Sequence, residues 1–280
     1  MKTLAVHLHL YYLEQLPEML SYLRSLEGQN YDLFVTMPQP NKDAEDALKN
    51  LKSDVKLIIV PNKGWDVGAF IEVLHRIDLD DYKYILKLHT KGDVTKNHTW
   101  LNGHRLDNKL WRHILLDALL KDKTRLQNNL NFMENNPTVG MLSSNYCIGQ
   151  EKRTYRKLLP QINKALEECG FPPVNQVRFV AGTMFCVRAA LLKPLLRYTL
   201  QDFPISDGQV KEGTFAHVME RLFGVLMPIQ GYKLYGIEHD NYRTGFFMAA
   251  VKHFLYQKKI TTNGYTIIKV CRIPVWHRKG

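Results

Sequence analysis

The sequence has few cysteines and no long apolar run. Its 280 residues include four cysteines, which form no C-x-x-C pair and show no metal-ligand spacing: Cys147, Cys169, Cys186 and Cys271. This pattern indicates reduced thiols of a cytosolic protein and no disulfide framework. No stretch is apolar for long enough to span a bilayer. His7 and His9 interrupt the apolar N-terminus and make it a poor signal peptide, so we expect a cytoplasmic protein.

Two common phosphate-binding loops are absent as well. The glycine turn at residues 61–68, PNKGWDVG, matches neither G-x-G-x-x-G nor G-x-x-x-x-G-K-[ST]. A dinucleotide oxidoreductase and a P-loop phosphotransferase are therefore disfavoured. The net charge of +11 favours an anionic partner, such as nucleic acid, lipid headgroups or a phosphorylated small molecule. A basic nucleic-acid-binding adaptor is the main alternative to an enzyme, but none of the usual nucleic-acid modules is found, and we expect no nucleic acid as partner.

Strand and helix patterns alternate along the chain. Apolar runs predict strands over 4–12, 31–37, 55–62, 82–90, 139–144 and 232–238, and one long strand or a strand pair over 177–188. Helical patterns cover 17–26, 43–51, 66–77, 100–135 with a break near Asn102-Gly103, 151–170, 189–198 and 212–226. The alternation predicts a single nucleotide-binding α/β domain with a mainly parallel central sheet over residues 1–245. A basic amphipathic C-terminal appendage over residues 246–280 follows it.

The turn after the third predicted strand carries polar side chains. Gly64 allows a tight turn, and Gly68 allows close packing of the next helix. Asp66 is suited to cap that helix through its side-chain oxygen, which is the structural interpretation. The functional interpretation is that Asn62 and Asp66 hydrogen-bond the ribose or base of a nucleotide.

The fourth predicted strand ends in His89-Thr90-Lys91-Gly92-Asp93. Ligands of α/β proteins bind at the carboxyl ends of the strands, so this segment is a candidate site. The first strand ends nearby in His9 and Tyr11, which are secondary candidates for donor contacts, although a histidine in so apolar a strand is more often a core residue. In the strand region 177–188, Gly182 and Thr183 are small enough to let an acceptor approach the backbone, although a plain buried strand explains them nearly as well.

The helix predicted near residue 220 has an apolar face for the core and a polar face. His217, Glu220 and Arg221 lie on the polar face, and Glu212 precedes the helix. A solvated helix face is the simpler interpretation. The functional one places a general base here, with Glu220 held by Arg221 or His217. Asp207 is a third candidate base.

Taken together, these segments resemble the rhamnan synthesis protein F family of bacterial cell-surface polysaccharide glycosyltransferases. The matching segments, in the family's order, are VHLHLYY with YDLFVTM, PNKGWDVGAFIEVL, YKYILKLHTK, FVAGTMFCVR and EGTFAHVMERLFG. Glu212 stands where the family has an aspartate in D-G-T, and Cys186 where an aromatic residue is usual. The resemblance implies a GT-A-like fold, a nucleotide-sugar donor such as dTDP-rhamnose or a UDP-hexose, and a growing or lipid-linked glycan as acceptor.

The resemblance also implies a chemistry for the fourth strand. Many transferases with a similar sheet end this strand in Asp-x-Asp, which holds a divalent metal against the diphosphate. Here Lys91 is expected to replace the metal, assisted by His89 and Arg221, while Glu212 or Glu220 takes the acceptor proton in one inverting displacement. A surface loop with an incidental lysine is the alternative, and Lys87 and Lys96 nearby are consistent with it. No cofactor is expected, although Asp93 would allow a version dependent on Mg²⁺ or Mn²⁺. A sugar-phosphate transferase is a second alternative.

The C-terminal segment mixes basic residues with Ile, Val, Tyr and Trp. That mixture suits an anionic membrane surface, where cations meet lipid headgroups and aromatic rings sit at headgroup depth. We therefore expect peripheral attachment at the inner face of the cell membrane. A basic surface helix and a last strand are the alternative interpretation.

Overall fold

A seven-stranded sheet forms the centre of the protein. The computed structural model describes residues 2–92, 99–150, 155–205, 213–260, 265–271 and 273–279. The sheet has the order β11-β7-β10-β4-β1-β2-β3, and all neighbouring pairs are parallel except those of β10, which is antiparallel to β4 and β7. The predicted α/β fold with a mainly parallel central sheet is confirmed. Its strands are β1 Lys2–His9, β2 Tyr31–Met37, β3 Lys56–Ile59, β4 Tyr82–His89, β7 Val139–Ser144, β10 Phe185–Arg188 and β11 Lys233–Ile237.

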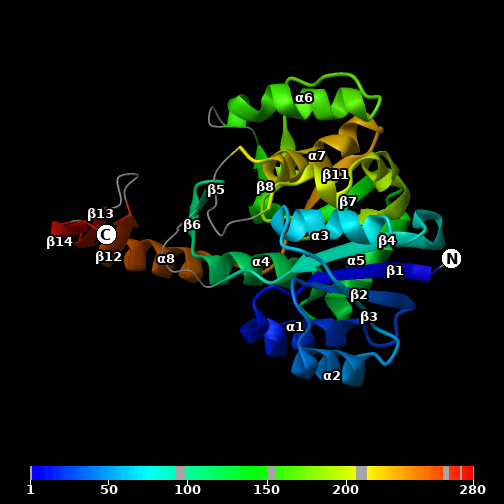
Figure 1. Ribbon diagram of the computed structural model, residues 1–280, viewed down its shortest axis with the longest axis horizontal. Coiled ribbons are helices and arrows are strands. Elements are labelled where there is room, and N and C mark those ends of the chain that lie inside the picture. Colours follow the sequence, from blue (N-terminus) through cyan, green and yellow to red (C-terminus); the bar gives the residue numbers. More distant parts are fainter. Residues whose placement is uncertain are drawn as a thin grey trace.

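Helices cover both faces of this sheet (Figure 1). One layer contains α1 Leu16–Leu23, α2 Lys42–Leu51, α4 Asn108–Leu120 and α5 Lys123–Asn135, and the other contains α3 Trp65–Leu74, α6 Leu159–Glu168 and α7 Phe215–Ile229. Covered on both faces, the central strands are apolar almost throughout. Short 3₁₀ helices link the elements: η1 Leu13–Gln15, η2 Arg24–Leu26, η3 Leu79–Asp81, η4 Asn145–Cys147, η5 Tyr155–Leu158, η6 Ala189–Arg197 and η7 Leu200–Asp202.

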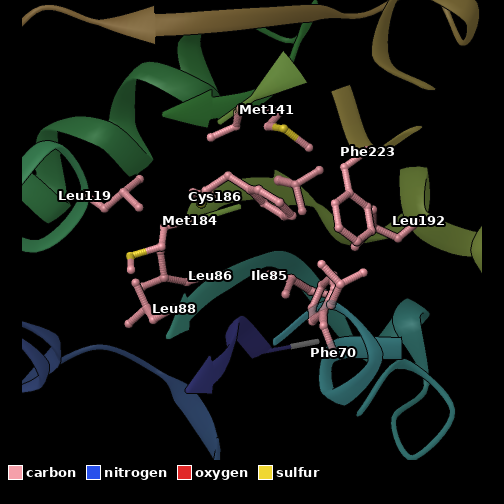
Figure 2. Packing of buried hydrophobic residues seen from close by; sticks show 14 of the residues in the cluster. Phe70, Ile85, Leu86, Leu88, Leu119, Met141, Met184, Cys186, Leu192 and Phe223 are labelled. Atoms are coloured by element: carbon pink, nitrogen blue, oxygen red, sulfur yellow. The ribbon is translucent and has the colours of Figure 1, made fainter. Parts of the chain in front are cut away.

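The main core lies where α3 and α7 meet the sheet. Phe70 of α3, Phe185 of β10 and Phe223 of α7 are at most 1% exposed, and their ring centroids lie 5.4, 5.7 and 6.0 Å apart in pairs. Figure 2 shows Phe70 and Phe223 on one side of the sheet and Leu119 and Met184 on the other. The central strands are thus packed from both sides.

Residues 99–106 form a hairpin, so the prediction of a helix from residue 100 is wrong for this part. Its strands are β5 Thr99–Leu101 and β6 His104–Leu106. The two residues between them, Asn102 and Gly103, have φ of 49° and 83°. Asn-Gly favours such a two-residue hairpin turn because both residues tolerate positive φ.

Residues 177–188 form two strands rather than one, and the two strands belong to different sheets. β9 Arg178–Val180 pairs with β8 Ile148–Gln150, whereas β10 lies in the central sheet. Gly182 and Thr183 lie between them with φ of 90° and 50°. This left-handed turn lets the chain leave one sheet and enter the other.

The C-terminal region adds a helix and a second, smaller sheet. α8 Arg243–Leu255 leads to a three-stranded antiparallel sheet of β12 Tyr256–Ile260, β13 Tyr265–Val270 and β14 Ile273–Lys279. Figure 1 shows this sheet at the end of α8, away from the central sheet. The predicted boundary at residue 245 falls inside α8, and the division into two domains stays a prediction. Over the described ranges, no helix combines the length and the apolar character needed to cross a bilayer.

A buried carboxylate ties the parallel strands together at the amino edge of the sheet. Asp32 of β2 accepts hydrogen bonds from Lys2 Nζ at 2.7 Å and Tyr82 Oη at 2.6 Å, and Lys56 Nζ lies 3.1 Å away. Its partners come from β1, β4 and β3. Burial would raise the pKa of Asp32, but the hydrogen bonds from Lys2, Tyr82 and Lys56 outweigh it and lower this pKa to about 2.

We predict that Asp32→Asn lowers the free energy of unfolding by about 2 kcal/mol at neutral pH. The folded-state pKa lies below the unfolded one, so the stabilisation is present above about pH 4 and is lost as the pH falls toward 2. Urea unfolding at neutral and acidic pH should therefore show the gap between wild type and variant closing on acidification. Asp54→Asn is the matched control, because that carboxylate is 61% exposed and should change stability little. A gap that is constant with pH would contradict the prediction.

Candidate active site

Five elements place polar side chains at the carboxyl edge of the central sheet. β1 and β4 are adjacent and end at the paired residues His9 and His89. α3 begins at Trp65, after the turn that follows β3, and brings Asp66 to this edge. The left-handed turn between β9 and β10, together with α7, closes the other side. The carboxyl edge of a parallel sheet is the usual place for a ligand in this fold class.

Asp66 and Lys87 form a buried ion pair at the centre of this group. Lys87 Nζ lies 2.5 Å from Asp66 Oδ2 and donates to the carbonyl and hydroxyl oxygens of Thr183, both at 3.0 Å. These three acceptors satisfy the ammonium completely, which is required because the Lys87 side chain is 0% exposed. Thr183 Oγ1 also donates to Asp66 Oδ2 at 2.5 Å.

The structural interpretation of the sequence expected Asp66 to cap α3. The ion pair with Lys87 explains why it does not. Gly64, with φ of 66°, occupies the N-cap position, and the Asp66 carboxylate is engaged by Lys87 and Thr183 instead. Burial would raise the pKa of Asp66, but the charges of His89 and Lys87 hold it well below its usual range. Asp66 is therefore a fixed negative charge and a poor general base.

His89 is held between two carbonyl groups. Its Nδ1 lies 2.9 Å from the oxygen of Thr90, and its Nε2 lies 2.7 Å from the oxygen of Gly182 and 3.8 Å from Asp66 Oδ2. Burial lowers the pKa of His89, and the nearby Asp66 charge partly opposes this. Because both ring nitrogens face protein oxygens, His89 fixes the turn at Gly182 in this arrangement.

The turn at Gly182 and Thr183 is strained and supported from all sides. A Cβ at Gly182 would lie 2.9 Å from Trp111 Nε1 and 2.8 Å from Leu115 Cδ1, so packing against α4 requires the glycine. Thr183 adopts a left-handed φ that costs free energy for a residue with a side chain. The acceptor role of these two residues stays a prediction.

On α7, Glu220 contacts the same turn. Its Oε1 accepts from the Gly182 amide at 2.9 Å, and its Oε2 lies 2.5 Å from Arg221 Nη1. The expected hold of Arg221 on Glu220 is thus observed. Arg221 also donates to the carbonyl of His217 at 3.1 Å, and its guanidinium lies 4.6 Å from the ring centre of Phe179. The predicted polar face of this helix is packed against β9 rather than solvated.

Lys91 sits in a rigid loop. Its amide donates to Gln15 Oε1 at 2.9 Å, and its carbonyl accepts from Gln15 Nε2 at 2.7 Å and Arg112 Nη1 at 2.6 Å. Arg112 is 2% exposed and is paired with Glu18. Lys91 Nζ lies 3.9 Å from the ring centre of Trp111, and no carboxylate of the described residues lies within ion-pair distance of it. Burial lowers the pKa of Lys91, against the opposing charges of Asp66 and Glu220.

Beside these charges lie polar atoms with no hydrogen-bond partner among the described residues. His7 Nε2 and His9 Nδ1 both contact Thr36 Oγ1, at 2.8 and 2.9 Å, which leaves His9 Nε2 buried and unpartnered. Asn62 Oδ1, in the turn after β3, is also buried without a hydrogen-bond partner. Burial lowers the pKa of His9 to about 4, so the ring is neutral at pH 7. Such atoms are candidates for ligand hydrogen bonds.

Some predicted residues lie outside this cluster or outside the described ranges. Tyr11 is 41% exposed, and the His217 ring lies 5.3 Å from Trp65 at the start of α3. Asp93, Asp207 and Glu212 lie outside the described residues. Within those residues, no group of three or more His, Cys, Asp or Glu side chains could hold a metal ion.

Sequence reasoning treated Lys87 only as a neighbour of Lys91. The signal that could have found it is a lysine inside an otherwise apolar central strand, YILKLH, because a buried ammonium requires a buried counter-charge. Trp111, Arg112 and Gln15 carried no comparable signal, since they come from distant helices.

Comparison with known proteins identifies a family for most of this chain. The profile of the rhamnan synthesis protein F family matches residues 1–232. Two curated relatives, each called uncharacterized protein WxcX, come from Xanthomonas campestris pv. campestris strains B100 and ATCC 33913. Each is 26% identical over 242 residues, which is 83% of this chain and 32% of the relative. The chain therefore spans about a third of the length of these relatives.

Solved structures show weaker likeness. Mannosyltransferase PcManGT from Pyrobaculum calidifontis is 14% identical, with 91% of this chain and 62% of that chain covered and a TM-score of 0.41. Glucosyl-3-phosphoglycerate synthase from Mycobacterium tuberculosis is 10% identical, with 99% and 90% covered and a TM-score of 0.39. Scores at this level do not establish a shared fold.

We predict strong coupling between Asp66 and Lys87. Asp66→Asn should lower the free energy of unfolding by about 3 kcal/mol, because it leaves a buried ammonium without its counter-charge. Adding Lys87→Met should recover part of this loss, because the uncompensated charge is then gone. Urea unfolding of both single variants and of the double variant measures the coupling. Additive effects of the two substitutions would contradict the ion pair.

Proposed function

Since this chain belongs to the rhamnan synthesis protein F family, we propose that it is a glycosyltransferase that uses a nucleotide-sugar donor. The observation that carries the proposal is the rigidly held cation Lys91 at the carboxyl edge of the sheet, with the carboxylate of Glu220 across the Gly182 turn. A transferase of this kind needs positive charge for a departing diphosphate and a carboxylate for an acceptor proton. The charge of Lys91 is directed by its loop and is not neutralised by a described carboxylate.

The nucleotide would bind beside the first and third strands. His9 Nε2 and Asn62 Oδ1 are buried atoms that a base or ribose could satisfy, and Tyr11 offers an exposed ring whose centroid lies 6.3 Å from that of His9. Asp66 contributes its fixed negative charge to this side of the site. The donor sugar proposed is rhamnose from dTDP-rhamnose or a hexose from a UDP-hexose, on the basis of the family's role in rhamnan synthesis.

The chemical step would be a single displacement. The base removes the proton of an acceptor hydroxyl while that oxygen bonds to the anomeric carbon. The bond between the anomeric carbon and the phosphate oxygen breaks, and the diphosphate leaves with the electron pair. Lys91 offsets the charge that develops on the diphosphate, and Arg221 and His89 support the site around it. The outcome would be inversion at the anomeric carbon.

Glu220 and Glu212 remain the two candidates for the base. Both Glu220 oxygens already accept from protein groups, Gly182 and Arg221, which orients the carboxylate. Carboxylate oxygens have further lone pairs for an acceptor hydroxyl. The acceptor would approach over Gly182 and Thr183 and would be a growing or lipid-linked glycan.

A divalent metal does not fit the described part of the site. Asp66 is engaged by Lys87 and Thr183, and the other carboxylate facing this edge, Glu220, is engaged by Gly182 and Arg221. Asp93 is the ligand that a version dependent on Mg²⁺ or Mn²⁺ would use. The proposed mechanism therefore assigns the electrostatic work to Lys91.

We predict that nucleotide sugars raise the melting temperature of the purified chain. A ligand at about 100 times its Kd stabilises the folded state by about 2.7 kcal/mol through mass action. A thermal-shift panel of dTDP- and UDP-sugars, with free nucleotides and oligonucleotides as comparisons, makes the measurement. A shift with oligonucleotides alone would overturn the proposal in favour of nucleic-acid binding.

We also predict that substitutions of Lys91 and Glu220 affect the reaction in different ways. Lys91→Ala should lower kcat by roughly two to three orders of magnitude, because it removes charge stabilisation of the leaving group. Glu220→Gln should keep donor binding and lose transfer if Glu220 is the base, and Glu212→Gln is the parallel test. Lys49→Ala is the control, since that lysine is 49% exposed on α2. A wild-type rate of transfer by Lys91→Ala would contradict the role of Lys91. Normal transfer by both glutamate variants would assign the role of general base to Asp207 or Asp93.

A further inference from the structure

Positive charge is concentrated at the C-terminal end of the chain. Residues 241–280 hold eight Lys and Arg residues and no Asp or Glu, so they supply most of the net charge of +11. The preceding 240 residues are therefore close to neutral. A segment with this charge attracts an anionic partner and repels a cationic one.

Exposed apolar side chains are concentrated in the same region. Eight of the fourteen large hydrophobic side chains that are exposed in the described residues lie there: Phe247, Met248, Phe254, Leu255, Val270, Ile273, Val275 and Trp276. Ile273 is 65% exposed and Phe247 is 66% exposed. An exposed apolar surface of this density marks an interaction site rather than ordinary protein surface.

The unit that carries these residues is anchored to the body at its start. Tyr242 Oη donates to Asp117 Oδ2 of α4 at 2.6 Å, and Tyr22 Oη donates to the other oxygen of the same carboxylate at 2.5 Å. The ring of Phe246 stacks on His104 of β6, with centroids 4.2 Å apart and an angle of 16° between the ring planes. α8 therefore leaves the body in a defined direction.

That direction is related to the candidate active site. Figure 1 shows β1 running from the N-terminus toward the side of the molecule from which α8 and the three-stranded sheet project. The carboxyl edge of the central sheet, where Lys91 and Glu220 lie, thus faces the same side as the C-terminal unit. A surface bound by this unit would lie on the side of the molecule where the proposed transfer takes place.

We propose that the described residues 243–260, 265–271 and 273–279 form a docking surface for an anionic lipid bilayer. Basic residues meet the headgroups, and exposed side chains such as Phe247, Ile273 and Trp276 enter the interfacial region. Nucleic acid would use the charge but would have no use for Ile273 and Val275 on the surface. Such attachment is peripheral and weakens with salt, because surface charges are screened. The lipid surface itself is independent of the proposed activity; only the choice of a lipid-linked acceptor rests on the proposed function.

Co-sedimentation of the full chain with vesicles tests the surface without donor or acceptor. Vesicles of phosphatidylcholine and phosphatidylglycerol should bind the protein at low salt and release it at high salt, whereas phosphatidylcholine alone should not bind it. A charge variant with Lys258→Gln, Lys259→Gln and Lys269→Gln should bind about 100-fold more weakly, since each basic residue contributes about fivefold. An apolar variant with Phe247→Ser, Ile273→Ser and Val275→Ser should also lose binding.

The matched control carries Lys49→Gln, Lys83→Gln and Lys123→Gln, which remove three exposed lysines from the body and should leave vesicle binding unchanged. Equal loss in this control, full binding by the apolar variant, or binding of oligonucleotides in place of vesicles would each overturn the proposal. Because nucleotide-sugar binding is measured separately by thermal shift, failure of the docking surface and failure of the proposed function give different results.

Discussion

The buried pair of Asp66 and Lys87 is the interaction on which the candidate site depends. An ammonium that is fully removed from water is tolerated only with complete hydrogen bonding and a counter-charge. Asp66 and Thr183 supply both, so α3, β4 and the turn before β10 are held to one geometry. The same geometry positions Glu220, because its carboxylate accepts a hydrogen bond from the amide of that turn. Electrostatic compensation in the interior therefore determines where the groups at the edge of the sheet stand.

Two kinds of polar group meet at this edge: groups that have protein partners and groups that lack them. Asp66, Lys87 and His89 are satisfied by protein atoms and form the foundation of the site. The Lys91 ammonium has no ion-pair partner among the described residues, and His9 Nε2 and Asn62 Oδ1 have no hydrogen-bond partner there. A ligand gains the most binding free energy from groups of the second kind. To bind groups of the first kind, it would first have to displace the protein atoms that already hydrogen-bond them. The division matches a site that is preorganised before its substrates arrive.

Much of the fold could be predicted from the sequence, because apolar period and turn residues report on local structure. The strands of the parallel sheet and α1, α2, α3 and α7 lie close to their predicted ranges. A break at Asn102-Gly103 was predicted, but the hairpin strands on either side were missed because they are only three residues long. Asp66 and His89 were recognised as site candidates from their positions at element ends, Thr183 from its small side chain and Glu220 from the polar face of its helix. Their contacts with each other, and the part played by Lys87, depend on packing between segments 21 to 117 residues apart, which periodicity does not report.

The loop at Lys91 is gripped by its main chain rather than by its side chain. Gln15 and Arg112 hydrogen-bond the amide and carbonyl of this residue, and those groups are the same in nearly every amino acid. These hydrogen bonds fix the main chain at position 91, so side chains of different kinds would start from the same point of the site. The charge at this point could change during evolution, from cation to neutral group or carboxylate, without rebuilding the loop. A single codon can in this way alter how the edge of the sheet treats a bound anion.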